Sequence, residues 1–243
     1  MRRSGVLLPV TSLPSRFGIG TFSKEAYAFV DFLKEAGQKL WQILPLGPTG
    51  YGDSPYQAFS TFAGNPYLID LEELIENGWL TEEECENTDW GGSKSYVDYE
   101  KMYQGRFPLL RKAYHNSHIA ENAEFIAFCE ENDWWLSDYA LFMAIKGGAS
   151  FLEWDAPLKL REPEAIRRCR HELSDEICFW QFLQYLFAKQ WQALKAYANG
   201  KGISIIGDIP IYVALDSADT WSHPELFQLS EGCVPKAVAG VPP

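Results

Sequence analysis

A chain of 243 residues, with 47% hydrophobic and 22% charged residues, can form one large domain or two small ones, and this composition excludes an intrinsically disordered protein. The formal net charge of −12 argues against nucleic acid or an anionic membrane surface as a partner, because both attract basic patches. An uncharged substrate is compatible with this charge, and no apolar run approaches the roughly 18 residues of a membrane span.

The first ten residues and the cysteines favour a cytoplasmic protein. The segment MRRSGVLLPV carries a basic pair, but its apolar run is too short for a secretory signal. The five cysteines are scattered, odd in number and without a CxxC pair, so we expect neither a disulfide framework nor a zinc site. A reducing cytoplasm fits this usage, and we expect no metal and no cofactor.

The chain opens with the pattern of a parallel β–α–β unit. Residues 5–10 form a short apolar run that predicts a buried strand. Apolar residues then recur at helical spacing between Ser23, a suitable N-cap, and Gly37, which predicts a helix. A second apolar run at 40–46 predicts the next strand, and such a crossover is right-handed in nearly all proteins.

Residues 50–71, GYGDSPYQAFSTFAGNPYLIDL, have no sustained helical or strand period. A loop of this length is uncommon in a compact domain and is usually functional. Pro55 disfavours the α conformation at Ser54, so the neighbouring tyrosines sit on a stiff backbone. The rings either fill a core beneath the loop or bind a polar ligand with apolar faces, such as a sugar.

Residues 72–198 are mainly helical in pattern. Gly78 closes a first helix, and a capping box starts at Thr81. That first helix is predicted at 71–77, and further helices near 100–114, 119–131, 136–146 and 175–199. The tryptophans of this region are expected to fill contacts between helices.

A third apolar run, at 203–206, is followed closely by a carboxylate. Asp208 occupies the position at which (β/α)₈ barrels place functional groups, although capping of a loop or helix is an equally open interpretation. An ionised carboxylate accepts hydrogen bonds only, so Asp208 suits two sugar hydroxyls. Asp216 and Asp219 are expected to cap a short helix, and His223 has no visible metal partners.

Four stretches of the chain resemble the amylomaltase and disproportionating-enzyme family, the 4-α-glucanotransferases of glycoside hydrolase family 77. They are SGVLLPVTSLPSRFGIGTF, KLWQILPLGPTG, the loop GYGDSPYQAFSTFAGNPYLIDL and GISIIGDIPIYVALDSADTWSHPELF. They occur in the family's order. The resemblance extends over the whole chain, which corresponds to about the first half of a family member.

The resemblance implies the α/β class: the first part of a (β/α)₈ TIM barrel, with three parallel strands and a large, mainly helical insertion between strands 2 and 3. We expect residues 1–71 to start the barrel and to carry the signature substrate loop. Residues 72–174 then form the helical insertion subdomain. Residues 175–243 continue the barrel with a helix, strand 3 and the following loop, and the chain is expected to end before the barrel closes.

The family implies transfer of segments of α-1,4-glucans to glucose or another glucan by a retaining double displacement. Such chemistry needs two carboxyl groups about 5 Å apart, one a nucleophile and the other an acid/base. Both are expected beyond Pro243, so we place no catalytic residue in this chain. The expected partners are α-1,4-glucans, maltooligosaccharides and glucose, with neither nucleic acid nor membrane.

The resemblance also implies residues that bind substrate. Tyr56 matches the family tyrosine that lines the donor side of the cleft, and Ser54 lies beside it in the loop. Asp208 matches the strand-end aspartate that contacts the sugar near the scissile bond. Tyr51 matches a tyrosine of a second glucan site, and Tyr99 corresponds to a further tyrosine of that site. Two other classes stay open: a non-catalytic glucan-binding fragment and an inactive truncated product.

Overall fold

The computed structural model describes residues 2–50, 52–93, 95–237 and 240. The contacts within the chain divide it into two compact units. The first unit comprises Met1–Leu46, Gly64–Phe128 and Phe182–Ile209, and the second comprises Gly47–Ala63, Cys129–Gln181 and Pro210–Pro243. The expected division into residues 1–71, 72–174 and 175–243 stays a prediction.

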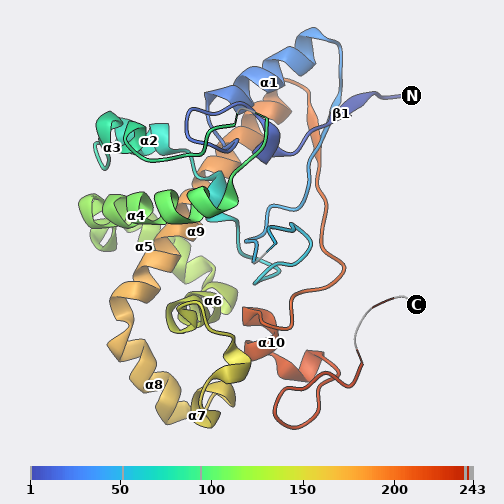
Figure 1. The fold of residues 1–243 in the computed structure, drawn as a ribbon. Helices are drawn as coiled ribbons and strands as arrows, with labels where there is room; N and C mark the ends of the chain where they lie inside the picture. The colour runs from blue at the N-terminus through green and yellow to red at the C-terminus, as the bar shows by residue number, and fades with distance from the viewer. Residues whose placement is uncertain (1, 51, 94, 238–239, 241–243) are drawn as a thin grey trace. The chain divides into compact units, whose positions relative to one another are not determined.

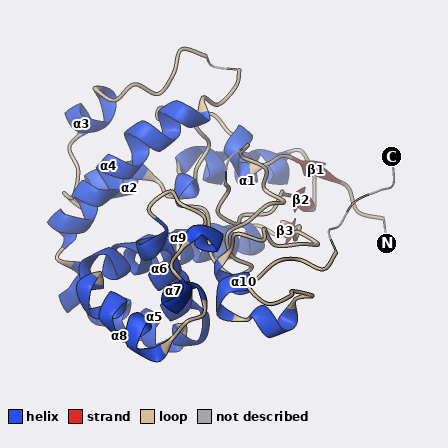
Figure 2. Cartoon of the chain, turned by 60° about the horizontal axis from the view of Figure 1, so that its bottom comes forward, coloured by secondary structure: helices blue, strands red, loops and turns tan. Residues whose placement is uncertain are grey.

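The first unit contains a sheet of three short parallel strands. Their order is β1 (Gly5–Leu7), β2 (Leu40–Gln42) and β3 (Ser204–Ile206). Helix α1 (Lys24–Glu35) connects β1 with β2, and a long, mainly helical segment connects β2 with β3 (Figures 1 and 2). Three parallel strands with a helical insertion between the second and the third confirm the predicted fold class.

Each strand is shorter than the apolar run that predicted it. Pro9 has no N–H to donate to a ladder, and the chain turns into a 3₁₀ helix at Val10–Ser12. At the start of β1, Gly5 is required by a close approach of two backbones. A Cβ at this position would lie 2.3 Å from the carbonyl oxygen of Leu40.

Helices α1 and α9 (Ser174–Gly200) pack together in the core of the first unit (Figure 1). Their contact includes the rings of Tyr27 and Tyr197, whose centroids are 4.9 Å apart. The buried core is apolar, and full burial of each large aliphatic side chain contributes about 1.5–3 kcal/mol. It is formed by Ala26, Val30, Leu33, Trp41, Ile43, Leu194, Ala198 and Ile203, with further apolar residues around them.

The segment between β2 and β3 contains most of the helices. They are α2 (Leu71–Glu76), α3 (Glu82–Glu86), α4 (Tyr99–Ser117), α5 (Ala123–Glu131), α6 (Asp133–Lys146), α7 (Ala156–Lys159), α8 (Pro163–Glu172) and α9. The predicted capping box is present: the Thr81 hydroxyl accepts the N–H of Glu84 at 3.3 Å, and the Glu84 carboxylate accepts the N–H of Thr81 at 2.9 Å. Helices α7 and α8 were not predicted, because α7 has only four residues and α8 is strongly polar and buries only Ala165 and Cys169.

Helix α10 (Ala218–Ser222) packs on α6 in the second unit. The prediction that Asp216 and Asp219 cap this helix is wrong. Ser217 is the N-cap, and its hydroxyl oxygen accepts the N–H of Thr220 at 3.2 Å. Asp216 forms an ion pair with Lys146 instead, and its Oδ1 accepts the N–H of Phe151 at 3.0 Å.

Two buried glutamines of α9 hold the loop that precedes α2. The side-chain oxygen of Gln184 accepts the N–H of Gly64 at 2.7 Å, and its amide group donates to the Gly64 carbonyl at 3.0 Å. Gln190 binds the N–H and the carbonyl of Asp70 in the same way, at 2.7 and 3.5 Å. Gly64 has no room for a side chain, because a Cβ would lie 2.2 Å from the ring of Phe187. The loop is thereby fixed along α9.

We expect Gln184→Leu to lower the free energy of unfolding by about 1–3 kcal/mol, because it leaves the buried N–H and carbonyl of Gly64 without partners. Urea unfolding followed by circular dichroism measures this change. Gln192 is exposed on the same helix, so Gln192→Leu is the matched control and should change stability by less than about 0.5 kcal/mol. Equal losses in the two variants would show that the Gln184 amide is not the cause.

Candidate functional site

Asp208 lies at the carboxyl end of β3, in the first unit. The strand ends at Ile206, and Gly207 separates it from Asp208. The side chain is exposed, and its Oδ1 accepts the N–H of Ile209 at 2.9 Å. An exposed carboxylate at a strand end is suited to accept hydrogen bonds from ligand hydroxyls.

The loop of the second unit presents Tyr56 at its surface. Thr49 and Ala58 form an antiparallel bridge that closes this loop. Asp53 adopts a left-handed conformation with φ of 53°, and the Ser54 hydroxyl oxygen accepts the N–H of Tyr56 at 3.3 Å. The Tyr56 side chain is 45% exposed, so the turn holds a phenol ring in contact with solvent.

The predicted residues are distributed over the two units. Ser54 and Tyr56 share one turn of the second unit. Asp208 and Tyr99 belong to the first unit, in which they lie on different elements. Tyr51 lies outside the described residues.

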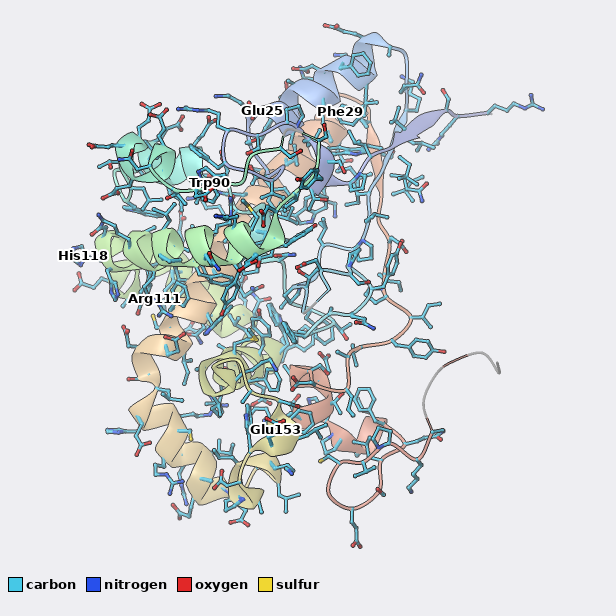
Figure 3. The ribbon with its side chains drawn as sticks, viewed as in Figure 1. Glu25, Phe29, Trp90, Arg111, His118 and Glu153 are labelled. Atoms are coloured by element: carbon cyan, nitrogen blue, oxygen red, sulfur yellow. The ribbon has the colours of Figure 1, made fainter. Side chains whose placement is uncertain are left out.

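Tyr99 lines a cavity of about 860 Å³ in the first unit, which we call the Trp90 cavity. The loop that follows β1 lines it together with the segment that leads to α4 (Trp90 is labelled in Figure 3). Its lining contains both aromatic and hydroxyl-bearing side chains, a combination that suits the apolar faces and hydroxyls of a sugar. These residues are Ser12, Ser15, Trp90, Ser93, Ser95, Tyr96 and Tyr99.

Charge pairs and one indole hold the lining of the Trp90 cavity. Arg16 donates to Glu82 and Glu86 of α3 at 2.7 and 2.6 Å. The Trp90 indole N–H donates to the carbonyl oxygen of Cys85 at 2.8 Å. Burial raises the pKa of the Cys85 thiol to about 11, so a thiolate nucleophile is excluded there at neutral pH.

A perturbed carboxylate in the same unit has a structural explanation. Burial raises the pKa of Asp70 to about 6, and the buried Arg106 opposes this rise. Asp70 is the N-cap of α2 and accepts the N–H of Glu72 at 3.1 Å. Because its side chain serves the helix end and is buried, we assign it to the fold and not to a reaction.

Sequence reasoning missed most of the Trp90 cavity, because it assigned the tryptophans to contacts between helices. A signal was present in WGGSKSYVDY, in which aromatic residues alternate with glycines and serines as they do in residues 50–71. Among the described residues, no group of His, Cys, Asp and Glu side chains could hold a metal ion. Within the same residues, no helix combines the length and apolar character needed to cross a membrane.

Comparison with known sequences identifies relatives along nearly the whole chain. Residues 8–243 match the profile of the Glyco_hydro_77 family, described as 4-alpha-glucanotransferase. The 4-alpha-glucanotransferase of Thermus thermophilus is 51% identical over 249 residues, which cover 100% of this chain and 49% of that protein. The 4-alpha-glucanotransferase of Clostridium butyricum is 49% identical over 238 residues, which cover 96% of this chain and 49% of that protein. The chain thus spans about half the length of these relatives.

Solved structures agree with the sequence comparison. The amylomaltase from Streptococcus agalactiae in complex with acarbose superposes with a TM-score of 0.96 at 48% identity, over 100% of this chain and 50% of that one. The amylomaltase from Corynebacterium glutamicum superposes with a TM-score of 0.68 at 20% identity, over 91% and 32% of the two chains. The second likeness shows the fold alone.

The Trp90 cavity depends on a glycine that no other residue replaces without strain. Gly18 has φ of 79°, and a Cβ there would lie 2.2 Å from the Met102 methyl group. We expect Gly18→Ala to lower the free energy of unfolding by about 1–3 kcal/mol. Gly92 lines the same cavity with no described atom within 4 Å of an added Cβ.

Gly92→Ala is therefore the matched control, with an expected change below about 0.5 kcal/mol in the same urea experiment. Equal stability of the Gly18→Ala protein and the wild type would contradict the conformation described for Gly18.

Proposed function

The chain belongs to the 4-alpha-glucanotransferases of glycoside hydrolase family 77, and we propose that the protein that carries it transfers segments of α-1,4-glucans to glucose or another glucan. One observation supports this proposal above all. The whole chain superposes with a TM-score of 0.96, at 48% identity, on an amylomaltase that was solved in complex with acarbose.

The proposed reaction proceeds with retention by a double displacement. A first carboxylate attacks the anomeric carbon and forms a glycosyl–enzyme bond, while a second carboxyl group protonates the leaving oxygen. A hydroxyl of an acceptor glucan or glucose then attacks the anomeric carbon, gives its proton to the second carboxylate, and displaces the enzyme carboxylate. We propose that both carboxyl groups lie beyond Pro243, within a complete (β/α)₈ barrel, and that this chain supplies substrate binding.

Asp208 is proposed to hold sugar hydroxyls near the scissile bond. Its place after β3 and its exposure support this role, because a carboxylate can accept hydrogen bonds from two hydroxyls at once. Tyr56 and Ser54 are proposed to bind the donor glucan. The exposed ring of Tyr56 offers a face for stacking, and Ser54 orders the turn that carries it.

A second glucan site is proposed at Tyr99 together with Tyr51. The position of Tyr99 in the Trp90 cavity supports its part in this site, because that cavity combines aromatic faces with hydroxyl groups. We also propose a cytoplasmic location, which the five free thiols favour.

Maltotriose tests the activity. The complete protein that carries this sequence should convert maltotriose to glucose and longer maltooligosaccharides, with retention at the anomeric carbon detected by NMR. The 243-residue chain alone should release no glucose above a blank without protein, because the nucleophile and the acid/base are proposed to lie beyond it. If it is instead a glucan-binding fragment, it will retain maltooligosaccharides without converting them.

Two results would overturn parts of this proposal. Failure of the complete protein to disproportionate maltotriose would contradict the proposed transferase activity. Glucose release by the 243-residue chain, abolished by Tyr56→Ala, would place the catalytic residues within it.

Substitutions of the two loop tyrosines, Tyr56 and Tyr51, distinguish the proposed donor site from the proposed second glucan site. In the complete enzyme, Tyr56→Ala should lower kcat/KM for transglycosylation by the equivalent of about 1–3 kcal/mol, because it removes a contact with the reacting sugar. Tyr51→Ala should have a much smaller effect on maltotriose. Small and equal effects of the two substitutions would show that both rings serve packing alone.

A further inference from the structure

The loop that presents Tyr56 is closed at its base by backbone contacts within the second unit. Thr49 and Ala58 form an antiparallel bridge, and the N–H of Phe59 donates to the carbonyl oxygen of Pro48 at 3.3 Å. Phe59 therefore belongs to the fixed end of the loop, three residues after Tyr56. Because the chain between these two residues is so short, a contact that holds Phe59 also limits where the Tyr56 ring can lie.

A buried ammonium group lies against the ring of Phe59. Lys146, the last residue of α6, is 9% exposed, and its Nζ lies 5.0 Å from the centroid of the Phe59 ring. The same Nζ lies 5.7 Å from the centroid of Phe142, a fully buried residue of α6. A cation within about 6 Å of an aromatic centroid is attracted to the ring, and the attraction is larger where water is excluded. The charge of Lys146 thus attaches the base of the loop to α6.

Oxygen atoms of neighbouring residues fix the ammonium group of Lys146. It forms an ion pair with Asp216, whose Oδ1 accepts the N–H of Phe151 at 3.0 Å. It also donates to the carbonyl oxygen of Ala149 at 3.2 Å. These contacts use two of the three N–H donors of an ammonium group. Lys146 therefore has a defined place from which its charge reaches Phe59.

The segment that carries Asp216 also binds the loop directly. The N–H of Ala218 donates to the carbonyl oxygen of Phe59 at 2.8 Å, and the N–H of Thr61 donates to the Asp219 carboxylate at 3.0 Å. The base of the loop is therefore bound both by this segment and by the ammonium group, and the ion pair of Asp216 connects the two.

Stability alone is a weak reason for a charge in this place. Removing two charges from water offsets much of their attraction, so a buried ion pair adds little net stability compared with apolar side chains of similar volume. What such a pair supplies is direction, because its hydrogen bonds hold in one geometry only. At Lys146 this geometry ends at Phe59, close in the chain to the residue that is proposed to bind the donor glucan.

We propose that Lys146 is a positioning residue for the donor glucan: by holding Phe59, it sets the Tyr56 ring where that ring meets the sugar. This inference rests on the proposed function, which assigns Tyr56 to the donor site. A displacement of about 1 Å in a substrate-binding group can cost about 100-fold in rate, even when its cause lies away from the reacting atoms. Lys146 therefore affects transfer without touching the glucan.

Maltotriose kinetics of the complete protein test whether the anchor acts through Tyr56. Phe59→Leu keeps the ion pair of Lys146 and removes the ring that the ammonium contacts, so kcat/KM should fall about tenfold. In a Tyr56→Ala background, the same substitution should lower kcat/KM by less than about twofold, because the ring to be positioned is already absent. A role in packing alone would give the same factor in both backgrounds.

Hydrogen exchange of the Phe59 amide tests the anchor without reference to activity. Lys146→Met removes the cation and keeps a long apolar side chain, so this amide should exchange about fivefold faster or more as the base of the loop opens. Lys195 is exposed on α9 in the first unit. Lys195→Met is therefore the matched control, and it should change neither the exchange rate nor kcat/KM.

Two results would overturn the role of Lys146. One is a kcat/KM that Phe59→Leu leaves unchanged or lowers by the same factor with and without Tyr56. The other is an unchanged exchange rate of the Phe59 amide in Lys146→Met. If the complete wild-type protein turns over no maltotriose, the proposed function fails by itself, whereas faster exchange in Lys146→Met still supports the anchor of the loop.

Discussion

The pairing of two glutamine side chains with the N–H and carbonyl groups of Gly64 and Asp70 is the constraint on which the first unit depends. Residues 64–70 are buried throughout, yet most of their peptide groups belong to no strand or α-helix. Buried N–H and carbonyl groups need partners, and Gln184 and Gln190 supply them at the two ends of the segment. Six residues of helix advance about 9 Å, whereas six extended residues cover about 20 Å, so the loop has to contract. The 3₁₀ turn at Pro66–Leu68 provides this contraction.

The contracted segment also determines where helix α2 begins. Asp70 is both the last residue held by α9 and the N-cap of α2, so the helix starts where the glutamine contact ends. The guanidinium group of Arg106, on α4, donates to the carbonyl of Ile69. Helices α9, α4 and α2 are thereby tied to neighbouring residues of one segment, which explains how residues 64–70 are held without a strand ladder.

Local signals in the sequence predicted much of this fold, and contacts distant in sequence account for the features that were not predicted. The capping box at Thr81 and the glycine after α2 depend on a few neighbouring residues, so the pattern alone indicates them. The ion pair of Asp216 with Lys146 depends on a partner 70 residues away in the chain, so no local pattern indicates it. At the candidate sites, the place of Asp208 after a strand was predicted from the apolar run before it. The Trp90 cavity was not, because a buried and a cavity-lining tryptophan look alike in sequence.

The glutamine contacts also make two amide protons into local reporters of motion. The N–H groups of Gly64 and Asp70 are protected by a side chain each and not by a ladder of backbone bonds. Strand amides exchange with solvent deuterium only when a cooperative opening breaks several bonds, whereas rotation of one glutamine can expose each of these two. Ile43 and Ser204 donate their N–H groups across the sheet to the carbonyls of Ile206 and Lys39. Comparison of the exchange rates of Gly64 and Asp70 with those of Ile43 and Ser204 therefore separates a local detachment of the loop from α9 from an opening of the sheet.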